Sequence, residues 1–186
     1  MDQNNKADQI KQIFTNWNIV GRYDSGDGSK HMGLMLLTSK NSSIDERIQS
    51  ITHQTASRQQ KLQIQGLIVR LTKGKNFGFV YCRSTPSSQE IKAMYTDYKD
   101  CNILMGDFNL SHRITEDQHK IDQLCQNKKV NSLNEITRSL SNNQLDYILI
   151  DEDLRFFVTS YNNFISDHKT IIARPASYEN ELTNED

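Results

Sequence analysis

The chain has 186 residues, which is long enough for one domain with a sizeable core. Its 35% hydrophobic content and mean hydropathy of −0.70 place it among the more polar globular proteins. The formal net charge is −1, from 22 basic and 23 acidic residues, and this excludes a general electrostatic attraction to nucleic acid. Any contact with DNA must therefore depend on local basic patches.

The cysteines and the hydropathy of the chain indicate its compartment. Cys82, Cys101 and Cys125 are odd in number and lack the spacing of a metal site, which is typical of a reducing environment without disulfides. No apolar stretch approaches the roughly 20 residues of a membrane span, and no secretory signal pattern opens the chain. We expect an intracellular protein, nuclear or cytoplasmic, that makes no membrane contact.

Strands and a few helices are expected along the chain. Alternation and short apolar runs predict the strands, with a hairpin turn at residues 73–76. Ser88 is the expected cap of one helix, and residues 115–118 have the pattern of a capping box that opens another. The predicted strands are 31–39, 62–71, 77–82, 103–105, 146–150, 156–160 and 170–174, and the predicted helices are 89–99 and 115–127. This mixture indicates an α+β fold.

Nothing along the chain suggests a second domain. There is no repeat, low-complexity linker or break in composition between the polar N-terminus and the acidic tail at 176–186. We therefore expect a single domain over residues 1–186, ordered over roughly 10–175.

The stretch Gly106-Asp107-Phe108-Asn109 follows an apolar run and offers a carboxylate and an amide two residues apart. In an extended segment, residues two apart point to the same side, so Asp107 and Asn109 are expected to address one phosphate while Phe108 turns into the core. This is a pattern suited to metal-assisted hydrolysis of a phosphodiester. The alternative is an ordinary strand that ends in a turn.

Two later segments favour the chemical interpretation. Asp146 lies in an apolar strand, where a carboxylate is costly to bury without a partner. Ser166-Asp167-His168 follows another apolar pair, and a histidine within hydrogen-bond reach would be a suitable partner for Asp146.

The order Gly-Asp-x-Asn, Leu-Asp-Tyr and Ser-Asp-His resembles the endonuclease/exonuclease/phosphatase superfamily of metal-dependent phosphodiesterases. With residues 81–87 upstream, the chain is most similar to the endonuclease domains of retrotransposons and related mobile elements. The resemblance covers roughly residues 14–174. It implies a two-sheet α/β sandwich flanked by helices, the DNase I-like fold.

The resemblance also implies roles for these residues. Asp107 would orient or deprotonate the attacking water, and Asn109 would donate to a phosphoryl oxygen. His168, supported by Asp146, would hold the phosphate as a cationic donor. Asp167 would bind Mg²⁺, with Mn²⁺ as the alternative cation. All five side chains are then expected to converge in one pocket.

Three further side chains are expected to contact the substrate. Tyr81 would touch the phosphate, although a core tyrosine is an equal alternative, and Arg83 is a second candidate for that contact. Ser166 would hold the end of its strand beside the site.

The opening part of the family pattern is missing. Members usually begin with a strand that ends in a metal-site Asn and then a strand that ends in Gln-Glu, whose Glu is the main metal carboxylate. The one Gln-Glu pair in this chain is Gln89-Glu90, at the start of a predicted helix. The resemblance thus implies an N-terminally truncated domain that binds Mg²⁺ weakly, unless Asp24, Asp27 or Glu90 replaces the lost Glu.

The function expected on these grounds is a Mg²⁺-dependent, mobile-element-type DNA endonuclease that acts as a monomer or as part of a larger polyprotein. One alternative is a catalytically impaired pseudonuclease fragment without turnover. Another is a phosphatase or phosphodiesterase of the same superfamily that acts on lipid or RNA, because one fold hosts many substrates.

Overall fold

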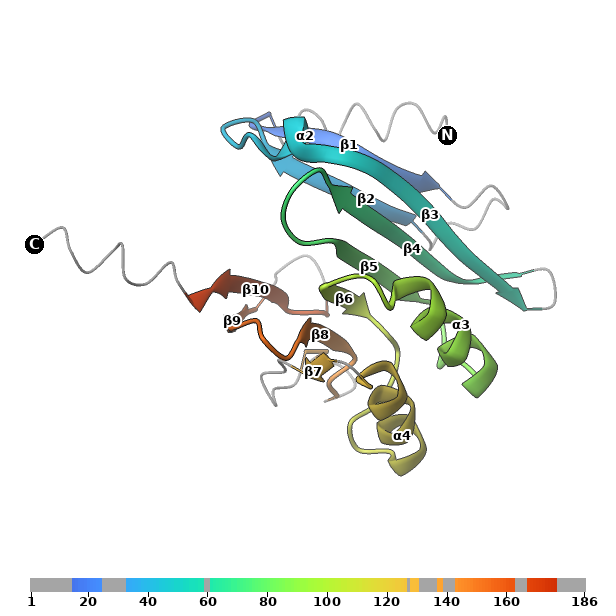
Figure 1. The fold of residues 1–186 in the computed structure, drawn as a ribbon. Helices are drawn as coiled ribbons and strands as arrows, with labels where there is room; N and C mark the ends of the chain where they lie inside the picture. Colours follow the sequence, from blue (N-terminus) through green and yellow to red (C-terminus); the bar gives the residue numbers. More distant parts are fainter. Residues whose placement is uncertain are drawn as a thin grey trace, which may run out of the picture.

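The computed structural model describes residues 15–24, 33–58, 61–126, 128–130, 137–138, 143–162 and 167–176. Within them, a six-stranded sheet has the order β3-β4-β5-β6-β8-β7, and β5 and β6 are its one parallel pair (Figure 1). Its strands are β3 (Ile48–Arg58), β4 (Lys61–Leu71), β5 (Phe77–Cys82), β6 (Ile103–Asp107), β8 (Asp146–Asp151) and β7 (Lys128–Val130).

Two helices cover one face of this central sheet. They are α3 (Ser88–Tyr98) and α4 (Thr115–Leu124), and they lie beside each other in Figure 1. Their apolar faces form one cluster with the side chains that β4, β5, β6 and β8 present on that face. The buried members that join helix to sheet include Ile91, Met94, Tyr98, Ile121, Leu124, Ile68, Val80, Leu104 and Leu149.

Two small antiparallel sheets cover the opposite face. One pairs β9 (Phe156–Tyr161) with β10 (Thr170–Pro175) and packs its inward side chains against Ile103, Ile148 and Ile150. The other pairs β1 (Trp17–Asp24) with β2 (Gly33–Ser39), and its Gly21 faces the side chain of Ile51. Since register places Ile51 and Ile103 in one row across β3 to β6, both small sheets lie on the same face.

This arrangement confirms the expected α+β fold, in which a two-layered β-sandwich is flanked by helices. Three of its strands, β1, β3 and β7, are absent from the sequence prediction. The short helix α2 (Ile44–Arg47) links β2 to β3 and was not predicted either. No helix among the described residues is long and apolar enough to cross a membrane.

Both predicted helix caps were wrong in detail. Ser87, rather than Ser88, caps α3: its hydroxyl accepts the Glu90 N–H at 3.3 Å, and the Glu90 carboxylate accepts the Ser87 N–H at 2.7 Å. The helix α4 has no side-chain cap. The side chain at the fourth position of the predicted box, Gln118, instead donates its Nε2 to the carbonyl of His112 at 2.5 Å.

Gly106 is required where β6 approaches β5. Its φ is 148°, which side-chain-bearing residues rarely adopt, and a Cβ at this position would lie 1.8 Å from the carbonyl oxygen of Val80. The two parallel strands therefore pack too closely here to admit any side chain.

Replacement of Gly106 by alanine is therefore expected to lower the free energy of unfolding by about 3 kcal/mol or more, from backbone strain and the clash with β5. Chemical denaturation measures the change. Gly21→Ala is the matched control, because its added Cβ meets nothing closer than 3.5 Å. Equal stability of the two variants would show that β5 and β6 are not this close.

Candidate active site

A row of polar side chains crosses the central sheet at the carboxyl ends of β5 and β6. Register pairs Gln65 with Tyr81, Tyr81 with Asp107, and Asp107 with Asp146. We call these four residues the polar row. Each of the four lies four residues along its strand from the apolar row that contains Phe77 and Ile103. Since every second residue of a strand points to the same face, the polar row shares the face covered by the small sheets.

Asp107 contributes a carboxyl group with a raised pKa to the row. Burial is the main cause that raises its pKa to about 6, and the charge of Asp146 adds to the increase. The backbone N–H of Asn109, which donates to Asp107 Oδ1 at 3.0 Å, and the charges of His168 and Arg138 oppose it. A carboxylate with this pKa is suited to accept a proton near neutral pH.

His168 lies against both carboxylates. Its Nδ1 is 2.9 Å from Asp146 Oδ2, and its Nε2 is 3.8 Å from Asp107 Oδ2. The hydrogen bond to Asp146 is the largest cause of the raised pKa of His168, and the charges of Asp146, Asp107 and Asp167 act in the same direction. Burial opposes this increase, and the two carboxylates thus favour the protonated imidazole, whose Nε2 is directed toward Asp107.

A short segment that the sequence analysis did not identify joins these elements. The hydroxyl of Thr137, which is buried, accepts the backbone N–H groups of Leu145 at 3.0 Å and Asp146 at 3.2 Å. Its carbonyl accepts the N–H of Lys169 at 2.7 Å. Thr137 therefore ties the start of β8, with Asp146, to the segment that carries His168.

Arg138 follows in the same segment and forms an ion pair with Asp167, with 2.7 Å between Nε and Oδ2. This ion pair lowers the pKa of Asp167 and raises that of Arg138. The carboxylate implied as the metal ligand by the resemblance is therefore directed to an arginine here.

A different group of side chains is close enough to share a metal ion. Asp107, Asp146 and His168 each offer one ligand atom, and these atoms lie within 4.8 Å of one another. A divalent cation would relieve the repulsion between the two carboxylates that contributes to the high pKa of Asp107. Carboxylate oxygens suit Mg²⁺ and Mn²⁺, whereas an imidazole ligand favours the transition metal.

Asn109 does not take the geometry expected from alternation. The strand β6 ends at Asp107, and Asn109 has a left-handed φ of 51°. Its side-chain Nδ2 donates to the carbonyls of Cys82 at 3.4 Å and Arg83 at 3.2 Å, so it fastens the loop after β5 to the loop after β6. Phe108 is buried, as expected.

The remaining predicted residues are placed as follows. Tyr81 lies beside Asp107 in the polar row, where burial raises its pKa and the charge of Arg83 lowers it. Ser166 and Asp27 lie outside the described residues. Glu90 is bonded to Ser87 and Arg58 at the start of α3, so its carboxylate is already committed.

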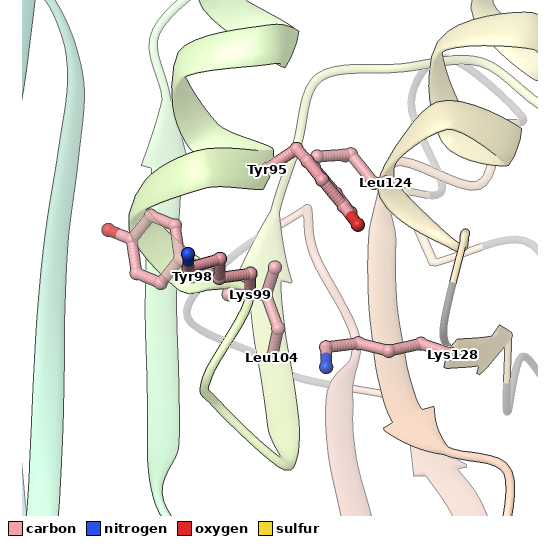
Figure 2. Close-up of a pocket in the computed structure, with 6 residues that line it drawn as sticks. All are labelled: Tyr95, Tyr98, Lys99, Leu104, Leu124 and Lys128. Carbon is pink, nitrogen blue, oxygen red and sulfur yellow. The ribbon is translucent and has the colours of Figure 1, made fainter.

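A small pocket elsewhere lacks this chemistry. It lies on the helix face, where Figure 2 shows side chains from α3, β6, α4 and the start of β7. Its lining residues are Tyr95, Tyr98, Lys99, Leu104, Leu124 and Lys128, and it contains no carboxylate. The polar row and His168 are therefore the better candidate for an active site.

No protein-family profile matches the chain, and no curated protein sequence matches it. Its structure is similar to that of a Cimex nitrophorin in its ferrous NO complex, with 14% identity, a TM-score of 0.56, and coverage of 92% of this chain and 79% of the nitrophorin. It is also similar to the endonuclease domain of TRAS1, a telomere-specific non-LTR retrotransposon, with 12% identity, a TM-score of 0.53, and coverage of 86% and 78%. A third similar structure is beta toxin from Staphylococcus aureus, with 15% identity, a TM-score of 0.53, and coverage of 94% and 83%.

These likenesses show that the chain has the DNase I-like fold. They do not select an activity, because a nitrophorin, an endonuclease domain and a toxin share the architecture. The function must be argued from the side chains of the site.

The role of Thr137 is tested by Thr137→Val, which keeps the shape of the side chain and removes the hydroxyl. Two backbone N–H groups then lose their acceptor, and we expect the free energy of unfolding to fall by about 2 kcal/mol or more. Chemical denaturation of Thr137→Ser is the control, because serine keeps the hydroxyl and should retain more of the stability. A serine variant as unstable as the valine variant would show that the methyl group, and not the two hydrogen bonds, is what matters.

Proposed function

We propose that this protein is a phosphodiester hydrolase that cleaves DNA with the aid of a divalent cation. The observation that carries the proposal is the arrangement of His168 between two carboxylates, with Nδ1 held by Asp146 at 2.9 Å and Nε2 directed to Asp107 at 3.8 Å. It brings a histidine donor, on the segment before β10, beside a proton acceptor, Asp107, at the carboxyl end of β6. Hydrolysis of a phosphodiester needs both kinds of group.

Asp107 is the proposed group that orients the attacking water and takes its proton. Its pKa of about 6 leaves it largely ionised at neutral pH while keeping it a stronger base than an exposed aspartate. The backbone N–H of Asn109 fixes the other oxygen of this carboxylate.

His168 is the proposed donor to a non-bridging phosphoryl oxygen, where negative charge develops during the attack. Asp146 holds the ring in position and favours its protonated form, because its hydrogen bond raises the pKa of His168. In this scheme Asn109 has a positioning role, since its amide is bonded to the carbonyls of Cys82 and Arg83.

Asp107 and Asp146 would hold the cation, which is Mg²⁺ or Mn²⁺ in this proposal. His168 would be a third ligand only in its neutral form, and in this scheme it is the protonated donor. When bound, such an ion would draw charge from the phosphoryl oxygens. Asp167 is a further ligand only if it leaves Arg138.

DNA is the proposed substrate because the motifs resemble those of mobile-element endonucleases, and the TRAS1 endonuclease domain shares the fold. The rival proposal is an impaired site without turnover. Two observations support it. The sequence has no Gln-Glu pair at a strand end, and the carboxylates of Glu90 and Asp167 form ion pairs with arginines.

Nicking of supercoiled plasmid, in Mg²⁺ and separately in Mn²⁺, tests the proposal. Asp107→Ala and His168→Ala each remove an interaction made in the transition state, so we expect each to lower the rate by on the order of a hundredfold or more with little change in DNA affinity.

Asp97→Ala on α3 and His119→Ala on α4 are matched controls, because both side chains are exposed on the helix face. A loss of affinity as large as the loss of rate would show a binding surface instead of a catalytic centre. A wild-type chain that is inactive with both cations would favour the impaired site.

A further inference from the structure

Arg138 is an arginine that lies against the acidic groups of the site. Its Nε is 2.7 Å from Asp167 Oδ2, and its charge also lowers the pKa of Asp107 and of Tyr81. The other nearby arginine, Arg83, lowers the pKa of Tyr81 but is not among the main causes of the shift at Asp107. Arg138 is therefore the more central of the two.

The backbone of Arg138 is fixed between the two elements that carry the catalytic candidates. It forms isolated β-bridges with Asn143 on one side and His168 on the other. Its N–H donates to the Asn143 carbonyl at 2.9 Å, and its carbonyl accepts the Asn143 N–H at 3.2 Å. The side chain thus starts from a backbone held between the segment that leads into β8 and the segment that carries His168.

The charges of the site call for such a cation. Asp107, Asp146 and Asp167 supply three carboxylates, and His168 and Arg138 supply the positive charges near them. A phosphodiester brings a further negative charge, so its binding requires a cation that is not fully neutralised by one partner.

The form of the guanidinium group meets this need. It is planar and has five N–H donors, so an arginine whose Nε binds Asp167 can still direct its Nη groups to a second oxyanion. The Arg138 side chain is 37% exposed and that of Asp167 is 26% exposed, and a pair this accessible contributes little to folding stability. Stability alone is therefore a weak reason for the pair.

We propose that Arg138 binds the non-bridging oxygens of a phosphodiester at this site, and that Asp167 is a positioning residue that fixes the plane of the guanidinium group. The inference rests on the proposed function for the identity of the anion. It assigns to Asp167 a contact with arginine in place of a contact with metal.

Binding of a fluorescein-labelled DNA duplex, measured by anisotropy in EDTA, tests the proposal without turnover. Arg138→Ala is expected to raise the Kd about tenfold or more and to reduce the slope of log K against log salt by about one, because one phosphate contact is lost. Arg138→Lys should restore the slope and only part of the affinity, since lysine keeps the charge and loses the planar fork. A merely structural role would not change the salt slope.

Arg70→Ala is the matched control. Arg70 is a half-buried arginine on β4, five residues along the strand from Gln65, or about 17 Å away. The Kd for DNA and the salt slope of the Arg70→Ala variant should equal those of the wild type.

Asp167→Asn completes the experiment as a double-mutant cycle. It should weaken binding in the wild type and have little further effect in Arg138→Ala, because Asp167 acts through Arg138. Equal effects in both backgrounds would overturn the positioning role.

The phosphate-binding role is overturned if Arg138→Ala keeps the wild-type affinity and salt slope, or if the wild type does not bind the duplex. The outcome is separate from that of the nicking assay. A chain that binds DNA through Arg138 and never nicks it would keep this inference and remove the proposed activity. If the wild type nicks DNA and Arg138→Ala binds DNA as well as the wild type, the proposed activity is kept and this inference is overturned.

Discussion

The hydrogen bond between His168 and Asp146 is the interaction on which the site depends. It joins the segment before β10, which belongs to a small sheet, to the first residue of β8 in the central sheet. Because register pairs Asp146 with Asp107, the same bond sets the distance between His168 Nε2 and the Asp107 carboxylate. Thr137 and Arg138 lie across this junction and bind both sides of it.

The site also shows the cost of placing polar groups inside a sandwich. Burial raises the pKa of Asp107 and of Tyr81, so neither is stabilised in its charged form by its surroundings alone. Gln65, at the end of the polar row, is fully buried, and neither polar atom of its amide has a hydrogen-bond partner among the described residues. Unsatisfied groups of this kind are commonest where function, and not stability, selects the residue.

The sequence pointed to side chains that the structure brings together: Asp107, Asp146 and His168. A carboxylate in an apolar strand needs a partner, and this requirement favoured a histidine for Asp146, while the family resemblance implied that this histidine is His168. Asn109 was placed wrongly because alternation holds only while the strand continues, and β6 ends at Asp107. Arg138 was missed because it lies between predicted elements, in a polar stretch without periodicity. Its position comes from bridges to two distant segments.

The same limit explains the strands that were not predicted. Residues 48–58 contain few apolar side chains, yet they form β3 because their backbone pairs along the length of β4, whose own side chains are buried on both faces. Glu90 is the opposite case, in which the sequence pattern is present and the structural setting differs. The sequence contains a Gln-Glu pair, but the capping box with Ser87 places Glu90 at the start of a helix and not at the end of a strand. A motif has its chemical meaning only in the strand or helix that carries it.

The most direct measurement of the central claim is an NMR titration of the His168 ring in the wild type and in Asp146→Asn. The chain has five histidines, so the His168 resonance is assigned by its loss in a His168 variant. If Asp146 holds a cationic imidazole against Asp107, the pKa of His168 lies above its ordinary value of 6.5 in the wild type and falls when the Asp146 charge is removed. A wild-type pKa at or below 6.5, or one that Asp146→Asn leaves unchanged, would contradict the account.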